Sequence, residues 1–582
     1  MISLRYLCAF APLWQKNRNA ILLFIVLSIY SRAQNLGKLG KKDMVTVSGG
    51  MNYNTIYYHA FGPESSGGDR RDPFTWYFNG NLNVSILDVS LPFTYSYSNQ
   101  HSTYSQPFNM QSCSPKYKWA QGHFGTTAMN FSSYTLAGHV FTGVGMELRP
   151  DRFYIGAMYG RLLKAVEYDA TQQSFANMAY KRMGAAMKFG YEDGSNAIGV
   201  TWFRAKDDAG SLQFIPNDAD LYAQENAAVS VNGKLKVKEH FIAEGEYALS
   251  GITRNINSLH ESISFNGFEK WLLTTHTSTE FFHAYKFSFG YSSKTISITL
   301  NHEHVDPDYQ TFGGYYFTND LQNWTIAPAF KLFSGKLAIA LNGGFQHNNL
   351  DKTKLTTTNR MVGSANVSIS PGKTWMGNLS YSDFTSFTNR RPQTDPFQYI
   401  LPSDTLLFYQ ISQQGNALIS HSFVGKNSKS TIVLSSSYQV SEQKQLLSAG
   451  PVTTVLNSNL SYNLQLVPSK ITASLIGNYN RSVVDTMITQ YAGPGIQFSK
   501  SIFNRALKVS VGTTYNRSYS QRTLTSHILS SRVQLSASVK PKDKKIGSVT
   551  LSVSGNYLDV FPVNSNSNSG ELTVMGNLGY GF

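Results

Sequence analysis

The sequence predicts an all-β protein, a single large, closed, antiparallel up-and-down transmembrane β-barrel of about 24 strands. Three observations predict this fold class. Apolar residues alternate with small or polar ones in many short segments, and short turn-rich links alternate with long polar links along the chain. Beyond the first 33 residues, no segment is long and apolar enough to cross a bilayer as a helix.

The first 33 residues read as a cleaved export signal. Lys16 and Arg18 precede an apolar run at 20–30, and Ser31 and Ala33 place small residues before a cut after Ala33. A membrane anchor is the alternative, but the run is shorter than the roughly 20 residues that span a bilayer. We expect a signal peptide at 1–33, a short periplasmic leader at 34–42 and the barrel at 43–582, with no plug domain ahead of the first strand.

Composition suits a barrel better than a disordered chain or a typical enzyme with a charged surface. Hydrophobic residues make up 41% of the chain and charged residues 15%, with 34 Tyr, 36 Phe and 46 Gly. The formal charge of +15 would fall to +11 on cleavage, because residues 1–33 contain four basic residues and no acid. This excess favours anionic solutes or lipid phosphates, unless it is general surface character. Cys113 would be the one cysteine left, so no intrachain disulfide is expected.

Strand segments and their links follow a regular order. Tyr and Trp residues flank many strands, as in the aromatic girdles of membrane barrels. Alternation is clearest at 296–300, 337–341, 471–475, 507–511, 533–537 and 549–553. Short links lie at 148–151, 191–195, 333–336, 370–373, 467–470 and 540–544, and long links near 61–73, 165–177, 205–224, 250–277, 304–320, 347–358, 385–412, 441–452 and 560–569. We expect the short links to be periplasmic turns and the long ones extracellular loops.

The range 99–137 does not fit this order. A single strand inside it would place the tight turn at 149–151 on the side of the long loops. We therefore predict one long extracellular connection at 99–137 that folds into the barrel and narrows its lumen, because its apolar content exceeds that of a free loop. A loop that packs outward on a partner or caps the rim is the alternative. The lumen residues expected in or beside this loop are Trp119, His123, Phe124, Phe131, Tyr134 and His139.

The last strand, 571–582, places Leu578, Tyr580 and Phe582 on one face and ends on an aromatic residue. This pattern resembles the terminal strand of Gram-negative outer-membrane β-barrels, whose final aromatic residue belongs to the signal read by the barrel-assembly machinery. A second stretch resembles large outer-membrane barrels of the Bacteroidota; it runs from Trp119 through F-S-S-Y-T-L at 131–136 and G-H at 138–139 to M-Y-G-R at 158–161.

The resemblance implies a location in the outer membrane of a Gram-negative bacterium. The partners it implies are outer-membrane lipid and lipopolysaccharide, the barrel-assembly machinery, and other outer-membrane proteins or lipoproteins. An exported barrel rarely meets nucleic acid, so we expect no nucleic-acid partner.

Residues suited to chemistry are few. His302 and His304 with Asp306 and Asp308 could bind a divalent metal, and a second acidic group could bind calcium; it comprises Asp207, Asp208, Asp218 and Asp220. Polar, solvated strand ends and loops explain both groups more simply. Serine and histidine residues are present, but sequence spacing does not show that they converge. We expect no catalytic residue, no metal and no cofactor.

Three classes of function remain. The first is a porin-like channel or transporter for polar or anionic solutes, with its lumen narrowed by the 99–137 loop. The alternative is a non-enzymatic barrel subunit of a larger outer-membrane assembly, secretion or surface complex, and a surface enzyme is a minor alternative. A barrel of this size encloses a lumen on the order of tens of ångströms wide, so something must fill part of it.

Overall fold

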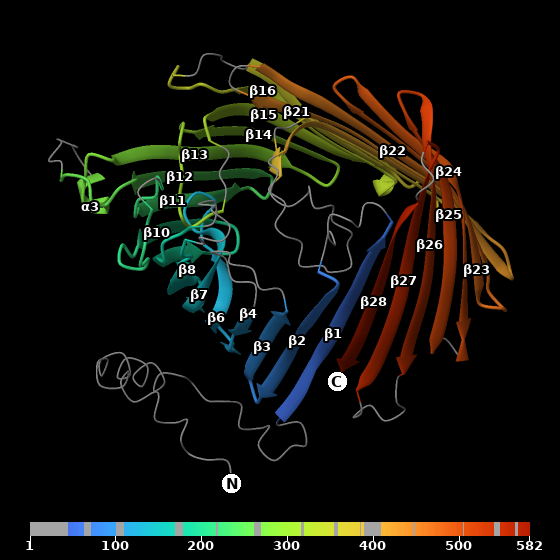
Figure 1. The fold of residues 1–582 in the computed structure, drawn as a ribbon. Coiled ribbons are helices and arrows are strands. Elements are labelled where there is room, and N and C mark those ends of the chain that lie inside the picture. Colours follow the sequence, from blue (N-terminus) through green and yellow to red (C-terminus); the bar gives the residue numbers. More distant parts are fainter. Residues whose placement is uncertain are drawn as a thin grey trace, which may run out of the picture.

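The protein folds as one closed antiparallel β-barrel (Figure 1). This computed structural model describes residues 45–62, 72–99, 110–168, 178–216, 219–260, 269–315, 319–353, 359–383, 386–388, 409–445, 448–503, 506–539, 547–564 and 568–582. The predicted signal peptide at 1–33 and leader at 34–42 lie outside these residues.

Each strand of the described part pairs antiparallel with a neighbour in sequence, and β1 pairs with β28 to close the wall. The 28 labelled strands occupy 26 positions, because β4 and β5 together make one position and β18 and β19 another. The N-terminal half contains β1 (Val45–Phe61), β2 (Phe74–Ile86), β3 (Val89–Ser98), β4 (Met110–Cys113), β5 (Lys116–Tyr117), β6 (Ala120–Asn130), β7 (Ala137–Leu148), β8 (Phe153–Leu163), β9 (Arg182–Glu192), β10 (Ala197–Asp207), β11 (Glu225–Val237), β12 (Phe241–Thr253), the short helix α3 (Glu269–Leu272), β13 (Thr279–Ser292) and β14 (Ile296–Val305).

The remaining strands complete the wall. They are β15 (Leu321–Leu332), followed by the 3-10 turn η5 (Phe333–Gly335), β16 (Leu337–His347), β17 (Asn359–Ile369), β18 (Trp375–Ser382), β19 (Ser386–Thr388), β20 (Tyr409–Val424), β21 (Ser428–Gln445), β22 (Ser448–Leu466), β23 (Ile471–Val484), β24 (Met487–Ile502), β25 (Leu507–Ser520), β26 (Thr523–Val539), β27 (Ser548–Pro562) and β28 (Ser569–Gly581). Among the described residues, no helix is long and apolar enough to cross a membrane.

The prediction that 99–137 forms one long connection is wrong. Strands β4, β5 and β6 occupy most of its described part, and a tight turn at 118–119 joins β5 to β6. The carbonyl of Trp119 accepts a hydrogen bond from the amide of Arg149 at 2.7 Å, so this turn lies beside the 149–152 turn at the same end of the barrel. A single strand position in this range would break the alternation of short and long links. The two positions that are present, β4 with β5 and then β6, preserve it. The barrel therefore has two positions more than the roughly 24 predicted.

The outer face of the wall is apolar along its circumference. Leu551, Leu578 and Val511 expose large side chains outward, while their neighbours Ser552, Asn577 and Ser510 face the lumen. This alternation confirms the faces predicted for the terminal strand, since Leu578 and Tyr580 both point outward. A closed wall with an apolar exterior is the geometry of a transmembrane barrel.

The two ends of the wall differ as predicted in the N-terminal half and less so in the C-terminal half. Short turns join β7 to β8, β9 to β10 and β11 to β12, and long links join the strands at the opposite end. The predicted long link at 441–452 is wrong, because β21 and β22 continue through it and pair as far as Gln445 and Ser448. Strands of 18 and 19 residues exceed the roughly 9–11 that cross a bilayer, so this hairpin extends beyond the membrane.

We expect replacement of Val533 by Lys to destabilise the barrel by about 2–4 kcal/mol, because this exposed residue faces lipid near the middle of β26. The matched change at the adjacent, lumen-facing Gln534 should cost less than about 0.5 kcal/mol. Urea unfolding in lipid vesicles measures both. Equal stability of the two variants would show that the outer face does not contact lipid.

Candidate functional site

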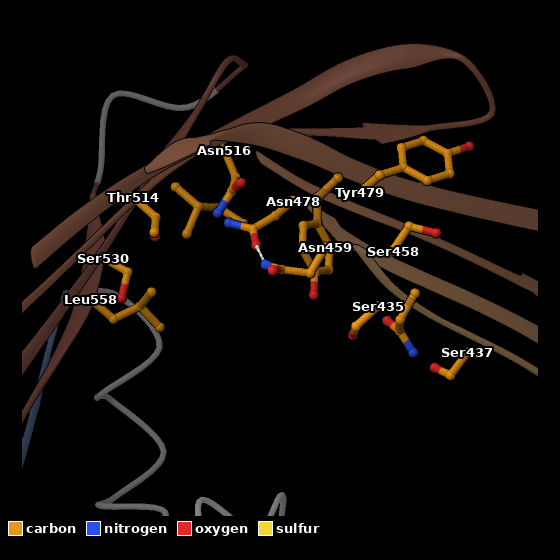
Figure 2. Close-up of a pocket in the computed structure, with 13 residues that line it drawn as sticks. Ser435, Ser437, Ser458, Asn459, Asn478, Tyr479, Thr514, Asn516, Ser530 and Leu558 are labelled. Atoms are coloured by element: carbon orange, nitrogen blue, oxygen red, sulfur yellow. Dashed lines mark hydrogen bonds between the residues drawn. The ribbon is translucent and has the colours of Figure 1, made fainter. Parts of the chain in front are cut away.

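The lumen face of the barrel differs between β6–β15 and β20–β28. Along β20–β28 it is lined by polar side chains that no other segment covers among the described residues. Strand register places hydroxyl and amide side chains inward along β20–β28, and many are solvent-exposed or half-buried. This wall contains a recess of about 450 Å³, whose lining residues are drawn in Figure 2. In the recess, the amide of Asn459 donates to the side-chain oxygen of Asn478 at 2.7 Å. Most of its lining residues are Ser, Thr, Asn or Tyr, among them Ser435, Asn457 and Asn516. This half offers water-like hydrogen-bonding groups to whatever enters the lumen.

Charged side chains are few on this neutral wall. Among its described residues, the inward-facing charges are Lys429 and Lys508 near the short-turn end, Arg532 midway and Glu571 towards the other end. The guanidinium of Arg532 is exposed and makes no hydrogen bond or ion pair with another described residue. The wall therefore carries an excess of positive charge.

The lumen face of β6–β15 is covered from inside by two segments. We call residues 131–136, which connect β6 to β7, the inner turn, and the described part of the β14–β15 connection, 306–315 and 319–320, the inner loop. Both lie against the lumen face of β6–β15 and are largely buried. Together they form an inner layer that thickens one side of the barrel.

Apolar packing attaches this inner layer to the wall. Phe131 and Leu136 of the inner turn and Phe312 of the inner loop share one buried cluster with Phe203 and Ile252 of the wall. Tyr134 and Tyr309 belong to a second buried cluster, with Ala248, Ala284, Val305 and Leu321. Each large apolar side chain buried in this way contributes about 1.5–3 kcal/mol. The lumen face of β6–β15 thus carries a hydrophobic core.

Polar wall residues fix the position of the inner turn. Lys188 of β9 donates to the carbonyl of Phe131 at 2.6 Å, and Lys286 of β13 donates to the hydroxyl of Ser133 at 2.6 Å. The hydroxyl of Tyr134 donates to Glu303 of β14 at 2.7 Å.

The buried carboxylate of Glu246 on β12 completes this set. It accepts a hydrogen bond from Ser132 and lies 3.1 Å from the ammonium of Lys286. Buried charges cost free energy unless they are paired and hydrogen-bonded, and Glu246 meets both conditions. The network therefore holds the turn in one place.

The inner turn and the inner loop also bind each other. The hydroxyls of Tyr309 and Thr311 donate to the carbonyls of Tyr134 and Thr135 at 2.6 and 3.0 Å. The carbonyl of Gly313 accepts from the amide of Ala137 at 2.8 Å. A Cβ at Gly313 would lie 2.3 Å from the carbonyl oxygen of Thr135, so only glycine allows this close approach. The two segments therefore form one unit.

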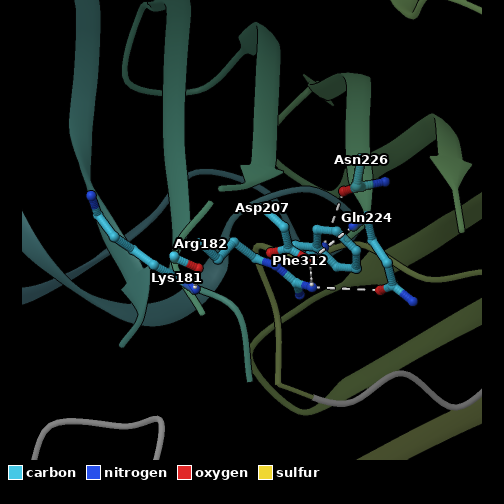
Figure 3. Close-up of polar contacts among 7 residues, drawn as sticks. Lys181, Arg182, Asp207, Gln224, Asn226 and Phe312 are labelled. Carbon is cyan, nitrogen blue, oxygen red and sulfur yellow. Dashed lines mark hydrogen bonds and ion pairs between the residues drawn. The ribbon is translucent and has the colours of Figure 1, made fainter. Parts of the chain in front are cut away.

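Figure 3 shows how the inner loop is attached at the ends of β9–β11. The guanidinium of Arg182 forms two hydrogen bonds to Asp207, at 2.7 and 2.9 Å, and lies 3.5 Å from the ring centre of Phe312. The amide of Phe312 donates to the side-chain oxygen of Asn226 at 3.0 Å. An arginine paired on its edge and stacked on its face is strongly oriented, which fixes Phe312 over the wall.

Burial raises the pKa of Tyr134 and of Tyr309 above the usual range of a phenol. Neighbouring carboxylates raise the pKa of each phenol further. These are Glu303 and Glu246 for Tyr134, and Glu246 and Asp306 for Tyr309. Both phenols therefore remain protonated at physiological pH and act as hydrogen-bond donors throughout.

The structure separates the six residues expected in the lumen. Trp119 lies in the β5–β6 turn and Phe124 faces outward from β6, so neither residue can narrow the lumen. Tight turns and lipid-facing strands also contain aromatic residues, so the sequence alone did not distinguish these two residues from loop residues. Phe131 and Tyr134 lie in the inner turn. His123 and His139 are buried in the wall, and His139 stacks on Tyr315 with ring centres 4.2 Å apart.

Sequence reasoning missed the wall residues that hold the inner turn, namely Lys188, Glu246, Lys286 and Glu303. Charged residues at lumen-facing positions do not by themselves indicate a contact with a distant segment. Small residues on the lumen face of β9–β13, such as Ala186, Ala228 and Ala284, are a signal that was available, because a segment can pack closely against them.

The proposed metal groups do not converge. Glu303 faces the lumen, whereas the neighbouring His302 stacks on Trp324 and His304 lies 3.0 Å from Asp306. Asp207 forms an ion pair with Arg182, and Asp208 forms one with Lys181. Asp218 lies outside the described residues. No group of three or more metal-binding side chains occurs within the described ranges.

Ser114, His123 and Glu147 lie in a row, which sequence spacing could not show. The hydroxyl of Ser114 is 3.4 Å from Nδ1 of His123, and Nε2 is 3.3 Å from Glu147. Both distances exceed those of a tight nucleophile–base pair, and Glu147 also lies 3.4 Å from Arg149. The nearby amide of Gly122 donates to the carbonyl of Pro115 at 2.8 Å and so is not directed at a reacting group. We interpret the row as a structural contact between β6, β7 and the β4–β5 link.

Comparisons with known proteins give no family and only distant structural likenesses. No protein-family model and no curated protein matches the chain. Among solved structures, the P pilus usher (PapC) translocation pore is 9% identical, with 91% of this chain and 99% of that chain covered and a TM-score of 0.37. The FrpB iron transporter from Neisseria meningitidis (F3-3 variant) is 10% identical, with 94% and 82% covered and a TM-score of 0.34.

OccAB4 from Acinetobacter baumannii is 10% identical, with 68% of this chain and 98% of that chain covered and a TM-score of 0.28. Likenesses this distant assign no activity. The strand pairing itself defines the class of this protein, a large closed β-barrel of the transmembrane type with an inner layer over half of its lumen.

We expect Tyr134→Phe to loosen the inner turn, because it removes the hydrogen bond to Glu303 and leaves a partly buried carboxylate without that donor. A loss of about 1–3 kcal/mol would speed amide exchange of Phe131 and Ala137 by about fivefold or more. Tyr247→Phe is the control, since Tyr247 faces outward and contacts His283. Equal acceleration in both variants would argue against a specific attachment.

Proposed function

We propose that this protein is a porin-like channel of the Gram-negative outer membrane and that polar solutes pass along the β20–β28 wall. The observation that carries this proposal is the contrast between the two halves of the lumen. The β6–β15 wall is covered by a packed, hydrogen-bonded inner layer, and the β20–β28 wall presents exposed hydroxyl and amide groups. A wide barrel that is narrowed on one side and polar on the other suits selective passage.

Wall chemistry favours two kinds of solute. Hydroxyl and amide groups such as those of Ser435, Asn459 and Asn516 exchange hydrogen bonds readily with hydroxylated solutes. The unpaired positive charge of Arg532, with Lys429 and Lys508 near one opening, favours anions over cations. The proposed substrates are therefore polar solutes, neutral or anionic.

Turn lengths support an orientation in which the short turns are periplasmic and the long links face the outside of the cell. The inner loop is then an extracellular connection that folds back into the lumen, and the inner turn lies below it. Export through a signal peptide at 1–33, closure by the assembly machinery and contact with lipopolysaccharide belong to this proposal. The subunit alternative predicts instead a lumen that a partner closes.

We expect removal of 132–135, with two glycines joining the remaining ends, to raise single-channel conductance in planar bilayers by about twofold, because the inner turn would no longer occupy the lumen. The cut spares β4–β6, which are part of the wall. Shortening the 563–568 link is the control, as is a check that each variant folds by its heat-modifiable mobility. A folded variant that conducts like the parent would show that the inner turn does not restrict passage, and this result would favour the subunit alternative.

We expect Arg532→Glu to shift ion selectivity from anions towards cations, because it reverses the one charge midway along the neutral wall. The reversal potential in a tenfold salt gradient measures this shift. Arg481→Glu is the matched control, since the strand register places Arg481 on the outer face. A similar shift in both variants would place the selective path elsewhere.

A further inference from the structure

Six neighbouring short turns form a continuous stretch of the rim between β13 and β25. They join β13 to β14, β15 to β16, β17 to β18, β20 to β21, β22 to β23 and β24 to β25. Consecutive turns are two strands apart, so their spacing is about 10 Å and the stretch is roughly 50 Å long. We call this stretch the lysine rim, and we include in it the three residues of each flanking strand that lie next to the turn.

Its charge is entirely positive within the described residues. The lysine rim contains nine lysines and no Asp or Glu; the lysines are Lys294, Lys331, Lys336, Lys373, Lys426, Lys429, Lys470, Lys500 and Lys508. The same rim from β2 to β12, defined alike, is balanced, with six basic residues (Lys116, Lys118, Arg149, Arg152, Lys236 and Lys238) and six acidic ones (Asp88, Glu147, Asp151, Glu192, Asp193 and Glu239). The excess is therefore local to one half and is not a general property of the turns.

The lysines have no acidic partner among the residues that the structure describes, and several point away from lipid. None of the nine forms an ion pair with a carboxylate of the described chain. Lys331, Lys429 and Lys508 pair in register with the lumen-facing residues Ala338, Gln465 and Ser536, so their side chains lie on the lumen side of the opening. Membrane phosphates surround the barrel on its outer side, which makes these three lysines unsuited to binding them.

Large apolar residues project among the lysines. Phe333, Val424 and Phe503 expose 73%, 74% and 74% of their surface, the highest values among the short turns. Phe333 and Phe503 also adopt φ of 52° and 50°, a left-handed conformation that bulky residues seldom take. Turn tips usually carry small polar residues, so exposed aromatic residues here indicate contact with another surface.

We propose that the lysine rim is a docking surface for a periplasmic protein with an acidic face, which Phe333, Val424 and Phe503 contact through apolar groups. Long-range attraction to unpaired lysines speeds and orients such an encounter, and buried aromatic residues supply much of the binding energy. The two phenylalanines are four turns apart, about 40 Å, so a folded partner or a long acidic segment is needed to reach both. This proposal does not require solute passage.

Two acidic peptides of about 20 residues serve as probes, one of glutamate alone and one with leucine at every fifth position. Binding to the full barrel in nanodiscs of phosphatidylcholine is measured at about 50 mM NaCl. One variant changes five turn residues, Lys294, Lys336, Lys373, Lys426 and Lys470, to serine. The control changes five basic residues of the balanced half to serine, namely Lys118, Arg149, Arg152, Lys236 and Lys238.

The rim variant should bind both peptides at least about tenfold more weakly, and the control should lose less than about threefold. The leucine-containing peptide should bind the parent more tightly than polyglutamate, and Phe333→Ser with Phe503→Ser should abolish that difference. Equal losses in the rim variant and the control would overturn the proposal, as would no advantage of the leucine-containing peptide.

Two further arms test other ligands for the same charge. Displacement of the peptides by inorganic phosphate, beyond the effect of chloride at equal ionic strength, would identify a site for free anions. Retention of phosphatidylglycerol in native mass spectra of the parent but not of the rim variant would identify a lipid site. Either result would overturn the docking surface.

Discussion

The structure depends on one constraint: backbone amide and carbonyl groups inside a bilayer must find partners within the protein. A sheet meets this requirement only when its first and last strands pair, and here β1 and β28 pair over twelve residues, from Gly50 with Gly581 to Phe61 with Gly570. The backbone of Phe582 extends the seam with two hydrogen bonds to Gly49, each 3.0 Å long. Closure removes the sheet edge, and the number of strands then sets the width of the lumen.

Much of the fold was predictable because strand alternation is local. Leu551 and Ser552 show the two faces in adjacent residues, and turn residues such as those at 467–470 mark the hairpins directly. The range 99–137 failed because β4 and β5 are short and the 118–119 turn lacks Gly and Pro. The contacts of the inner turn were not predictable, since Ser132 and Glu246 are 114 residues apart and only the closed wall brings them together.

Closure also explains why the lumen has two different halves. The inner turn and inner loop can pack on β6–β15 because the wall there presents Ala186, Ala228 and Ala284 inward, which leaves room for Phe131, Phe312 and Tyr309. The β20–β28 wall presents Asn and Ser instead, and these residues hydrogen-bond to one another; the hydroxyl of Ser474, for example, donates to the side-chain oxygen of Asn463. Apolar packing therefore stops where the wall becomes polar.

Paired and unpaired charged side chains also lie in different parts of the barrel. Lumen charges of the N-terminal half are used within the protein, as in the pairs of Lys286 with Glu246 and Arg182 with Asp207. Arg532 and the rim lysines, which lie between β13 and β26, have no acidic partner among the described residues. A paired charge stabilises a fixed contact, whereas an unpaired one attracts mobile anions or an acidic surface. Most of the unpaired positive charge thus lies on the part of the barrel that is free of the inner layer.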